Sequence, residues 1–159
     1  MTPSRDVPDQ AADFDLSTMT GHLLRSCQQI HVAIWSEVFP GGLTSPQFAI
    51  LHALAQQGPL TQTALRSKVR LDRSTTADVV RRLVARRLVS QVKDPEDARR
   101  RVVRLTAAGR ALYLESTTRA VKVNEAMLAG LDEEQRTQLL TLLGCLLERH
   151  KGLLDYRED

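Results

Sequence analysis

The sequence has few aromatic residues and few cysteines. Aromatic residues make up 4% of the 159 residues, and there are two Cys. A core therefore has to be built from Leu, Val, Ala and Ile. Cys27 and Cys145 lie far apart and neither belongs to a CxxC pair, which argues against a zinc finger or a disulfide framework. We expect both to be buried thiols in a reducing compartment.

Long hydrophobic runs are also missing. No apolar stretch approaches the roughly 20 residues that a membrane-spanning helix needs, and the N-terminal stretch MTPSRDVPDQAADFD lacks the apolar region of a secretory signal. A hydrophobic content of 42% and a charged content of 26% are ordinary for a folded chain. We therefore expect one cytoplasmic domain, preceded by a disordered arm over residues 1–16 and followed by a tail over 151–159.

Positive charge is concentrated in one block. Residues 61–110 hold 14 Lys and Arg against 5 Asp and Glu, a net charge of +9, whereas the remainder holds 8 against 14, a net charge of −6. Such a concentration is typical of proteins that bind polyanions. Charge alone does not separate that interpretation from a solvated basic surface.

Helical periodicity and capping residues predict a mainly α chain. Apolar residues recur at helical spacing over 17–38, with Ser17 as N-cap, and PGG at 40–42 ends that helix. Further helices are capped, in chain order, by Ser45, Thr61, Asp72, Thr106 and Asp132. The two short helices that begin after Thr61 and Asp72 are about three residues apart, which predicts a helix-turn-helix.

The helix that follows Asp72 has the composition of a DNA-recognition helix. At about 100° per residue, its apolar side chains gather on one side, and small hydroxyls followed by two arginines gather on the other. Short hydroxyl side chains allow close approach to a major groove, and Arg contacts guanine or phosphate. The candidate contacts on the two short helices are Thr61, Thr63, Arg73, Ser74, Thr75, Thr76, Asp78, Arg81 and Arg82.

Two short strands, LVSQVKD and RRVVRLT, surround the stretch DPEDARRRVVRL at 94–105. Their alternation predicts a hairpin directly after the recognition helix, which is the wing of a winged helix. Arginines at a wing tip favour the negative potential of a narrow minor groove. The candidate contacts here are Arg99, Arg100 and Arg101, together with Asp97, which we expect to brace Arg99 across the turn.

These segments resemble the MarR (multiple antibiotic resistance) family of regulators. The motifs LTSPQFAILHAL, LTQTAL, LDRSTTADVVRRLVARRLV and DPEDARRRVVRLTAAGRAL occur in the family's order and spacing over residues 17–150. Two positions depart from the pattern: Arg87 stands where the family usually has Gly and is a candidate phosphate contact, and Arg66 stands where it usually has Ala.

The resemblance implies a fold and a function. The implied fold is mainly α, with a winged helix-turn-helix lobe over 44–106 and long dimerisation helices over 17–40 and 107–150. It implies a homodimeric, non-enzymatic repressor that binds a pseudo-palindromic operator and is released by a small aromatic acid or its thioester. The leucines at 139–147, more than one small domain needs, are consistent with a helical dimer interface. No cofactor and no metal are expected.

The family's ligand pocket lies between the dimerisation helices and the DNA lobe. His31 and Trp35 are four residues apart on the first helix, and Phe48 and His52 repeat this spacing on the second. With Arg25 they are our candidate effector-binding residues, because aromatic walls and a few cationic groups suit an aromatic carboxylate. The alternative is that Trp35 and Phe48 belong to the core and the histidines are incidental.

Other functions remain open. A redox sensor would use Cys27, and a metal sensor would use His22, His31, His52 and His150, although these lack Cys or carboxylate ligands at useful spacing. A winged-helix protein-interaction module would expose apolar anchors on the recognition helix. A hydrolase or transferase could pair Cys27 with His31, but no third orienting group is evident.

Overall fold

The computed structural model describes residues 15–93 and 101–154. A 3₁₀ helix, η1 (Leu16–Thr18), leads into α1 (Thr20–Val38). There follow α2 (Ser45–Gln57), β1 (Leu60–Thr61), α3 (Gln62–Val69), α4 (Arg73–Ala85), β2 (Val89–Lys93) and β3 (Arg101–Leu105). The chain ends with α5 (Ala107–Met127), α6 (Glu133–Arg149) and α7 (Lys151–Leu154). The expected mainly α winged helix-turn-helix is therefore confirmed.

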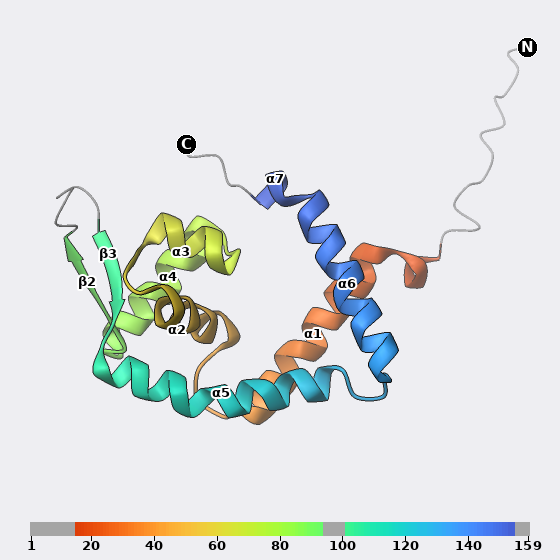
Figure 1. Cartoon of the computed structure of the whole chain (residues 1–159), viewed down its shortest axis with the longest axis horizontal. Helices are drawn as coiled ribbons and strands as arrows, with labels where there is room; N and C mark the ends of the chain where they lie inside the picture. The colour runs from red at the N-terminus through yellow and green to blue at the C-terminus, as the bar shows by residue number, and fades with distance from the viewer. Residues whose placement is uncertain (1–14, 94–100, 155–159) are drawn as a thin grey trace, which may run out of the picture.

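The elements divide into two regions joined by α5. Helices α2, α3 and α4 and the strands form a lobe at one end, whereas α1 and α6 lie at the other (Figure 1). Helix α5 runs beneath both and contacts α1 and α2. The lobe is closed by apolar side chains of α2, α3, α4 and the sheet, among them Ile50, Leu65, Val80, Leu83 and Val103, which are all 0% exposed.

The wing is the antiparallel pair β2–β3, which pairs Val89 with Leu105 and Lys93 with Arg101. The third strand, β1, pairs with β3 on its other side, giving the order β1-β3-β2. We did not expect β1, because two residues after a Gly-Pro turn carry no alternation from which a strand is predicted. It ties the start of the helix-turn-helix to the wing.

Two predicted helix starts are wrong, and four are confirmed. Met19 precedes α1 without a side-chain cap, whereas Ser17 lies inside η1 and its backbone N–H is bound by Asp15. Helix α2 is capped by Thr44 rather than Ser45, because Gln47 completes a capping box with Thr44. The caps at Thr61, Asp72, Thr106 and Asp132 are those expected.

A close contact explains the glycine in the LTAAG segment that follows the wing. A Cβ added to Gly109 would lie 1.9 Å from the carbonyl oxygen of Leu88, so only glycine lets α5 pack against the start of β2. The nearby Arg87 has a φ of 58°, in the left-handed region that favours the glycine usual in the family. Its carbonyl accepts a hydrogen bond from Thr106 Oγ1 at 2.8 Å.

Helices α1 and α6 leave large apolar side chains uncovered. No residue of α6 is buried, and its Leu140 and Leu142 are each 57% exposed. Both cysteines are exposed, so the expectation of buried thiols is wrong for the single chain. The reason is their location: Cys27 lies on α1 and Cys145 on α6, and neither position is covered by the lobe.

Candidate nucleic-acid interface and ligand cavity

The outer face of α4 carries five of the thirteen predicted DNA contacts. Ser74, Arg81 and Arg82 are exposed, and Thr75 and Asp78 are half-buried. Val79, Val80 and Leu83 on the opposite side are buried in the lobe core. This division between a polar and an apolar side is what a helix needs to pack on α2 and α3 while presenting its other face to a groove.

Thr76 does not belong to that face. Its side chain is 1% exposed, and its hydroxyl donates to the carbonyl of Asp72 at 2.8 Å. Four residues after the cap, it points to the same side as Val80 and Leu83. Its prediction as a DNA contact is therefore corrected: Thr76 is a core residue.

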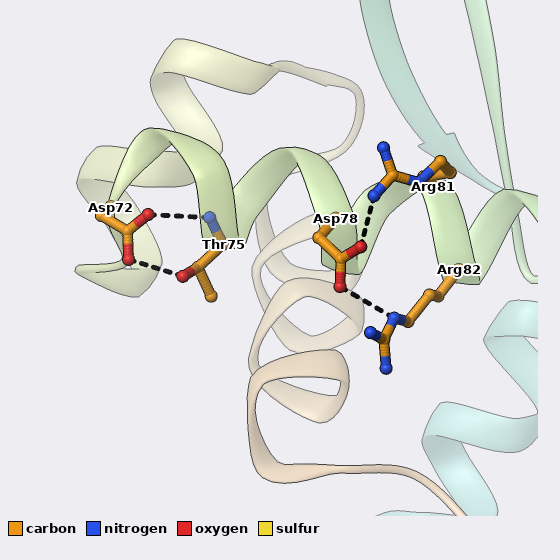
Figure 2. A network of polar contacts seen from close by, with 5 residues as sticks. All are labelled: Asp72, Thr75, Asp78, Arg81 and Arg82. Atoms are coloured by element: carbon orange, nitrogen blue, oxygen red, sulfur yellow. Dashed lines mark hydrogen bonds and ion pairs between the residues drawn. The ribbon is translucent and has the colours of Figure 1, made fainter.

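Asp72 organises the start of α4 (Figure 2). Its Oδ1 accepts from the backbone N–H of Thr75 at 2.7 Å and from the Ser74 hydroxyl at 2.6 Å, and its Oδ2 accepts from the Thr75 hydroxyl. These hydrogen bonds hold the pKa of Asp72 well below its usual range. Because both hydroxyls give their hydrogens to Asp72, they present lone pairs to the surroundings.

Asp78 holds two arginines one turn further along. One carboxylate oxygen accepts from Arg81 Nη2, and the other accepts from Arg82 Nε at 2.8 Å (Figure 2). The side chains of Arg81 and Arg82 remain 74% and 67% exposed. The face therefore carries two positive groups aimed by one negative group, with a net charge of +1 over these three residues.

The other predicted contacts among the described residues lie at the start of α3, at the start of α4 and at the start of β3. Thr61 is half-buried because its hydroxyl caps α3, accepting from Ala64 N at 3.2 Å, whereas Thr63 is exposed. Arg73 is exposed at the start of α4, and Arg101 is exposed at the start of β3. Asp97, Arg99 and Arg100 lie outside the described residues.

Sequence reasoning missed several cations that share this part of the lobe. Lys68 and Arg70 are exposed at the end of α3, and Arg104 is exposed on β3. Arg70 has a φ of 53°, so the turn between α3 and α4 is made by a left-handed arginine rather than a glycine. A strict search for charge at the turn of the helix-turn-helix would have found Lys68 and Arg70.

A cavity of about 520 Å³ separates α1 from the lobe. Its walls are the face of α1 from Gln28 to Phe39, the loop 41–46, Ala49 of α2, and Val69 and Leu71 beside the α3–α4 turn. This volume is in the range of small-molecule sites. Of the described residues that line it, His31 is the only titratable one.

The structure brings two of the five predicted effector residues to this cavity, namely His31 and Trp35. Phe48 packs behind Trp35, with ring centroids 5.7 Å apart, and belongs to the core. His52 is exposed, and its Nδ1 lies 2.9 Å from the hydroxyl of Tyr113 on α5. Arg25 is exposed on α1 and does not line the cavity. The other three therefore do not line this cavity, since α2 turns Phe48 and His52 toward Tyr113 on α5, and their role in effector binding stays a prediction.

Trp35 fixes one wall of the cavity. It is 8% exposed, its indole N–H donates to the carbonyl of Leu43 at 2.6 Å, and its ring stacks on Phe39 at 4.5 Å. His31, one turn earlier, lies with its ring 5.8 Å from the Trp35 ring. The Nδ1 atom of His31 is buried, and no described residue supplies it with a hydrogen-bond partner.

Arg86 connects the loop of the cavity to the recognition helix. It is the C-cap residue of α4, and its Nη1 lies 3.3 Å from Gln47 Oε1 and 3.5 Å from the carbonyl of Gly42. Gln47 is buried, and the same Oε1 accepts from the N–H of Thr44 at 3.1 Å. Since Gly42 and Thr44 line the cavity, one guanidinium joins its wall to α4.

Comparison with known proteins decides the family. The MarR family profile matches residues 43–100. The HTH-type transcriptional repressor NicR of Pseudomonas putida is 35% identical over 92% of this chain and 93% of its own length. The chain belongs to the MarR family. As a MarR-family protein it is a DNA-binding regulator of transcription.

Two solved structures of MarR-type regulators match most of the chain. That of Bordetella bronchiseptica BpsR, described in terms of regulation of DNA binding by 6-hydroxynicotinic acid, is 35% identical with a TM-score of 0.81, over 84% of this chain and 96% of that one. PcaV of Streptomyces coelicolor, in complex with its natural ligand, is 37% identical with a TM-score of 0.80, over 85% and 96%.

The described residues offer little support for the metal-sensor and protein-interaction alternatives. Among residues 15–93 and 101–154, no three His, Cys, Asp or Glu side chains gather in an arrangement that could hold a metal ion. No helix in this part of the chain is long and apolar enough to span a membrane. The outer face of α4 shows Ser74 and two arginines rather than apolar anchors, which favours DNA over a protein partner.

Proposed function

We propose that this MarR-family regulator is a cytoplasmic homodimeric repressor that a small aromatic acid, or its thioester, releases from a pseudo-palindromic operator. In this proposal, α4 of each protomer enters the major groove of one half-site, and the exposed predicted contacts on α3, α4 and the wing bind bases and phosphates. Thr76 is left out of that set. NicR, which is 35% identical over 92% of this chain, is a repressor, and this similarity supports repression rather than activation.

The uncovered apolar faces of α1 and α6 support the dimer. Leu23, Leu24 and Ile30 on α1 and Leu140 and Leu142 on α6 are each at least 48% exposed in one chain. Exposed leucines at such density are costly in water, and a second copy of the same faces would cover them. A dimer would also set two α4 helices about one turn of DNA apart.

The cavity between α1 and the α3–α4 turn is the observation that carries the release mechanism. It touches the proposed dimer region through His31 and Trp35, and the DNA lobe through Val69 and Leu71. A planar ring would pack beside Trp35, and a polar substituent of that ring would hydrogen-bond the imidazole of His31, which lines the cavity. Recognition of a free acid is favoured by BpsR, whose named regulator is 6-hydroxynicotinic acid.

Binding in this cavity would reach the DNA through the Arg86 connection. A ligand that displaces the loop at Gly42 and Thr44 also displaces Gln47 and the guanidinium of Arg86. Because Arg86 caps α4, the position of α4 then differs between the empty and occupied states. Only such a differential contact lets a ligand shift the equilibrium between DNA-binding states.

The test is binding of the full chain to the duplex DNA flanking its own gene, titrated with salt and then with 6-hydroxynicotinic acid. We expect a complex of two subunits per site, a steep dependence on salt, and release by the acid. Weak binding that is independent of sequence would overturn the operator and favour a protein-interaction module. Tight, sequence-specific binding that 6-hydroxynicotinic acid does not reverse would still support a DNA-binding regulator and would overturn release by this acid.

A further inference from the structure

We infer that Asp78 is a specificity-determining residue: it holds Arg82 in position to read a guanine in each half-site and leaves Arg81 for the DNA backbone. The inference rests on the proposed function, because it assigns separate roles to side chains on the same face of α4. It concerns which base pairs are chosen, whereas the proposal above concerns whether an operator is bound at all.

The two arginines contact Asp78 in different ways. Arg82 uses Nε, the nitrogen nearest its own backbone, which lies 2.8 Å from Oδ2. Arg81 uses Nη2, at the far end of its guanidinium, to contact Oδ1 (Figure 2). An ion pair as exposed as these contributes little to stability. Its consequence is geometric, since it fixes the direction of each guanidinium.

The contact through Nε leaves Arg82 suited to a base. Guanine is read in the major groove by two parallel N–H groups, which bind O6 and N7 together. Asp78 does not use the Nη1–Nη2 end of the Arg82 fork, so that pair is available as a unit. The side chain is already held at Nε and 67% exposed, so it loses less conformational freedom on meeting a base edge.

Arg81 is held in a way that suits a phosphate instead. Its Nη2 belongs to both edges of the guanidinium, and a base bound in bidentate fashion would have to share that nitrogen with Asp78. A phosphate oxygen needs only one N–H, which Nη1 supplies. At 74% exposed, the Arg81 side chain is also more accessible than that of Arg82, at 67%.

The carboxylate has a second effect of opposite sign. A negative charge on a DNA-binding face repels phosphates, so Asp78 lowers the affinity for every duplex while it sharpens the choice among them. A side chain that only stabilised α4 would raise the affinity for every duplex and the discrimination among duplexes together. A change at Asp78 should therefore move affinity and discrimination in opposite directions, whereas a purely structural change would move them in the same direction.

The experiment compares the full chain with Asp78→Asn, Arg82→Lys and Arg81→Lys. Each protein selects duplexes from a randomised library, and its affinity is then measured at one fixed salt concentration for the selected duplex, for duplexes with each G·C pair replaced in turn, and for a scrambled duplex. Glu115→Gln is the matched control, because Glu115 pairs with Arg119 four residues later on α5, with the charged atoms 3.9 Å apart, away from α4. Thermal unfolding of each protein is recorded alongside.

For the wild-type chain we expect replacement of one guanine per half-site to cost about ten-fold or more in affinity. Asp78→Asn should reduce that penalty to about three-fold or less and should raise the affinity for the scrambled duplex. Arg82→Lys should remove the penalty at the same position. Arg81→Lys should keep it, and Glu115→Gln should match the wild type.

Several results would overturn the assignment. It fails if Asp78→Asn discriminates as the wild type does, if the penalty disappears with Arg81→Lys rather than Arg82→Lys, or if Asp78→Asn loses affinity for all duplexes together with thermal stability. In each of these cases, selection of one sequence by the wild-type protein would still support its proposed function as a sequence-specific regulator. If the wild type selects no sequence, the proposed function fails as well.

Discussion

The lobe and the pair of helices α1 and α6 solve the problem of burying apolar side chains in opposite ways. In the lobe, Leu65, Val80 and Leu83 are 0% exposed, because three short helices and a sheet close around them. On α6, Leu140 and Leu142 are each 57% exposed, and no residue of that helix is buried. One chain completes the core of the first region and leaves the apolar face of the second uncovered, which the proposed dimer would cover.

We expect the largest effect on assembly and operator affinity from charges placed on α6. The double change Leu142→Glu and Leu146→Glu should dissociate the proposed dimer and weaken operator binding by roughly 100-fold or more, because two linked modules gain that much avidity. Sedimentation and operator titration measure this. The matched control, Ala108→Glu with Ala111→Glu, places two charges on exposed positions of α5 beside the lobe. A dimer that survives the α6 change would place the interface elsewhere.

A truncation in the lobe core should act differently. Leu65→Ala removes a fully buried side chain and should lower the free energy of unfolding by about 2–5 kcal/mol. Because the lobe core is complete within one chain, this loss should not depend on protein concentration. Urea unfolding at two concentrations measures it, and Leu142→Ala, at a 57% exposed position, serves as the contrast. A concentration-dependent loss for Leu65→Ala would mean that the lobe also relies on the partner.

The contact of Arg86 with Gln47 and Gly42, which links the cavity to α4, can also be tested by substitution. Arg86→Met should reduce the effect of 6-hydroxynicotinic acid on operator affinity by roughly ten-fold, which is a usual size for coupling between sites, while changing affinity without the acid much less. Arg87→Met removes the same charge from the next residue and should leave release intact. If the acid releases the Arg86→Met and wild-type complexes equally, Arg86 does not transmit ligand binding from the cavity to α4.

The smallest effect concerns the backbone at the end of α4. Arg87 has a φ of 58°, which is unfavourable for a residue with a Cβ. Arg87→Gly should raise the free energy of unfolding by about 1 kcal/mol or less, because relief of this strain is partly offset by the greater freedom of glycine in the unfolded chain. Chemical denaturation measures the change, and a marked loss of stability would show that the Arg87 side chain has a structural contact.

Local signals in the sequence predicted the helix-turn-helix well. The caps at Thr61 and Asp72 and the two faces of α4 depend on residues within a few positions of one another, so periodicity finds them. Thr76 shows the limit of that reasoning, since its polar side chain is buried once its hydroxyl binds the carbonyl of Asp72. Of the predicted effector residues, His31 and Trp35 line the cavity and the others do not, because spacing on one helix does not specify which neighbour that helix will face.

The sequence by itself determined that this chain is a MarR-family winged helix with a basic recognition helix, because those motifs are local and dense. The tertiary structure decided what lies between distant segments. It placed His31 and Trp35 in a cavity with Val69 and Leu71, turned His52 to Tyr113, and joined Arg86 to Gln47. It also left Cys27 and Cys145 exposed, because burial depends on which surfaces meet when the helices pack, and hydrophobicity along the chain does not specify that.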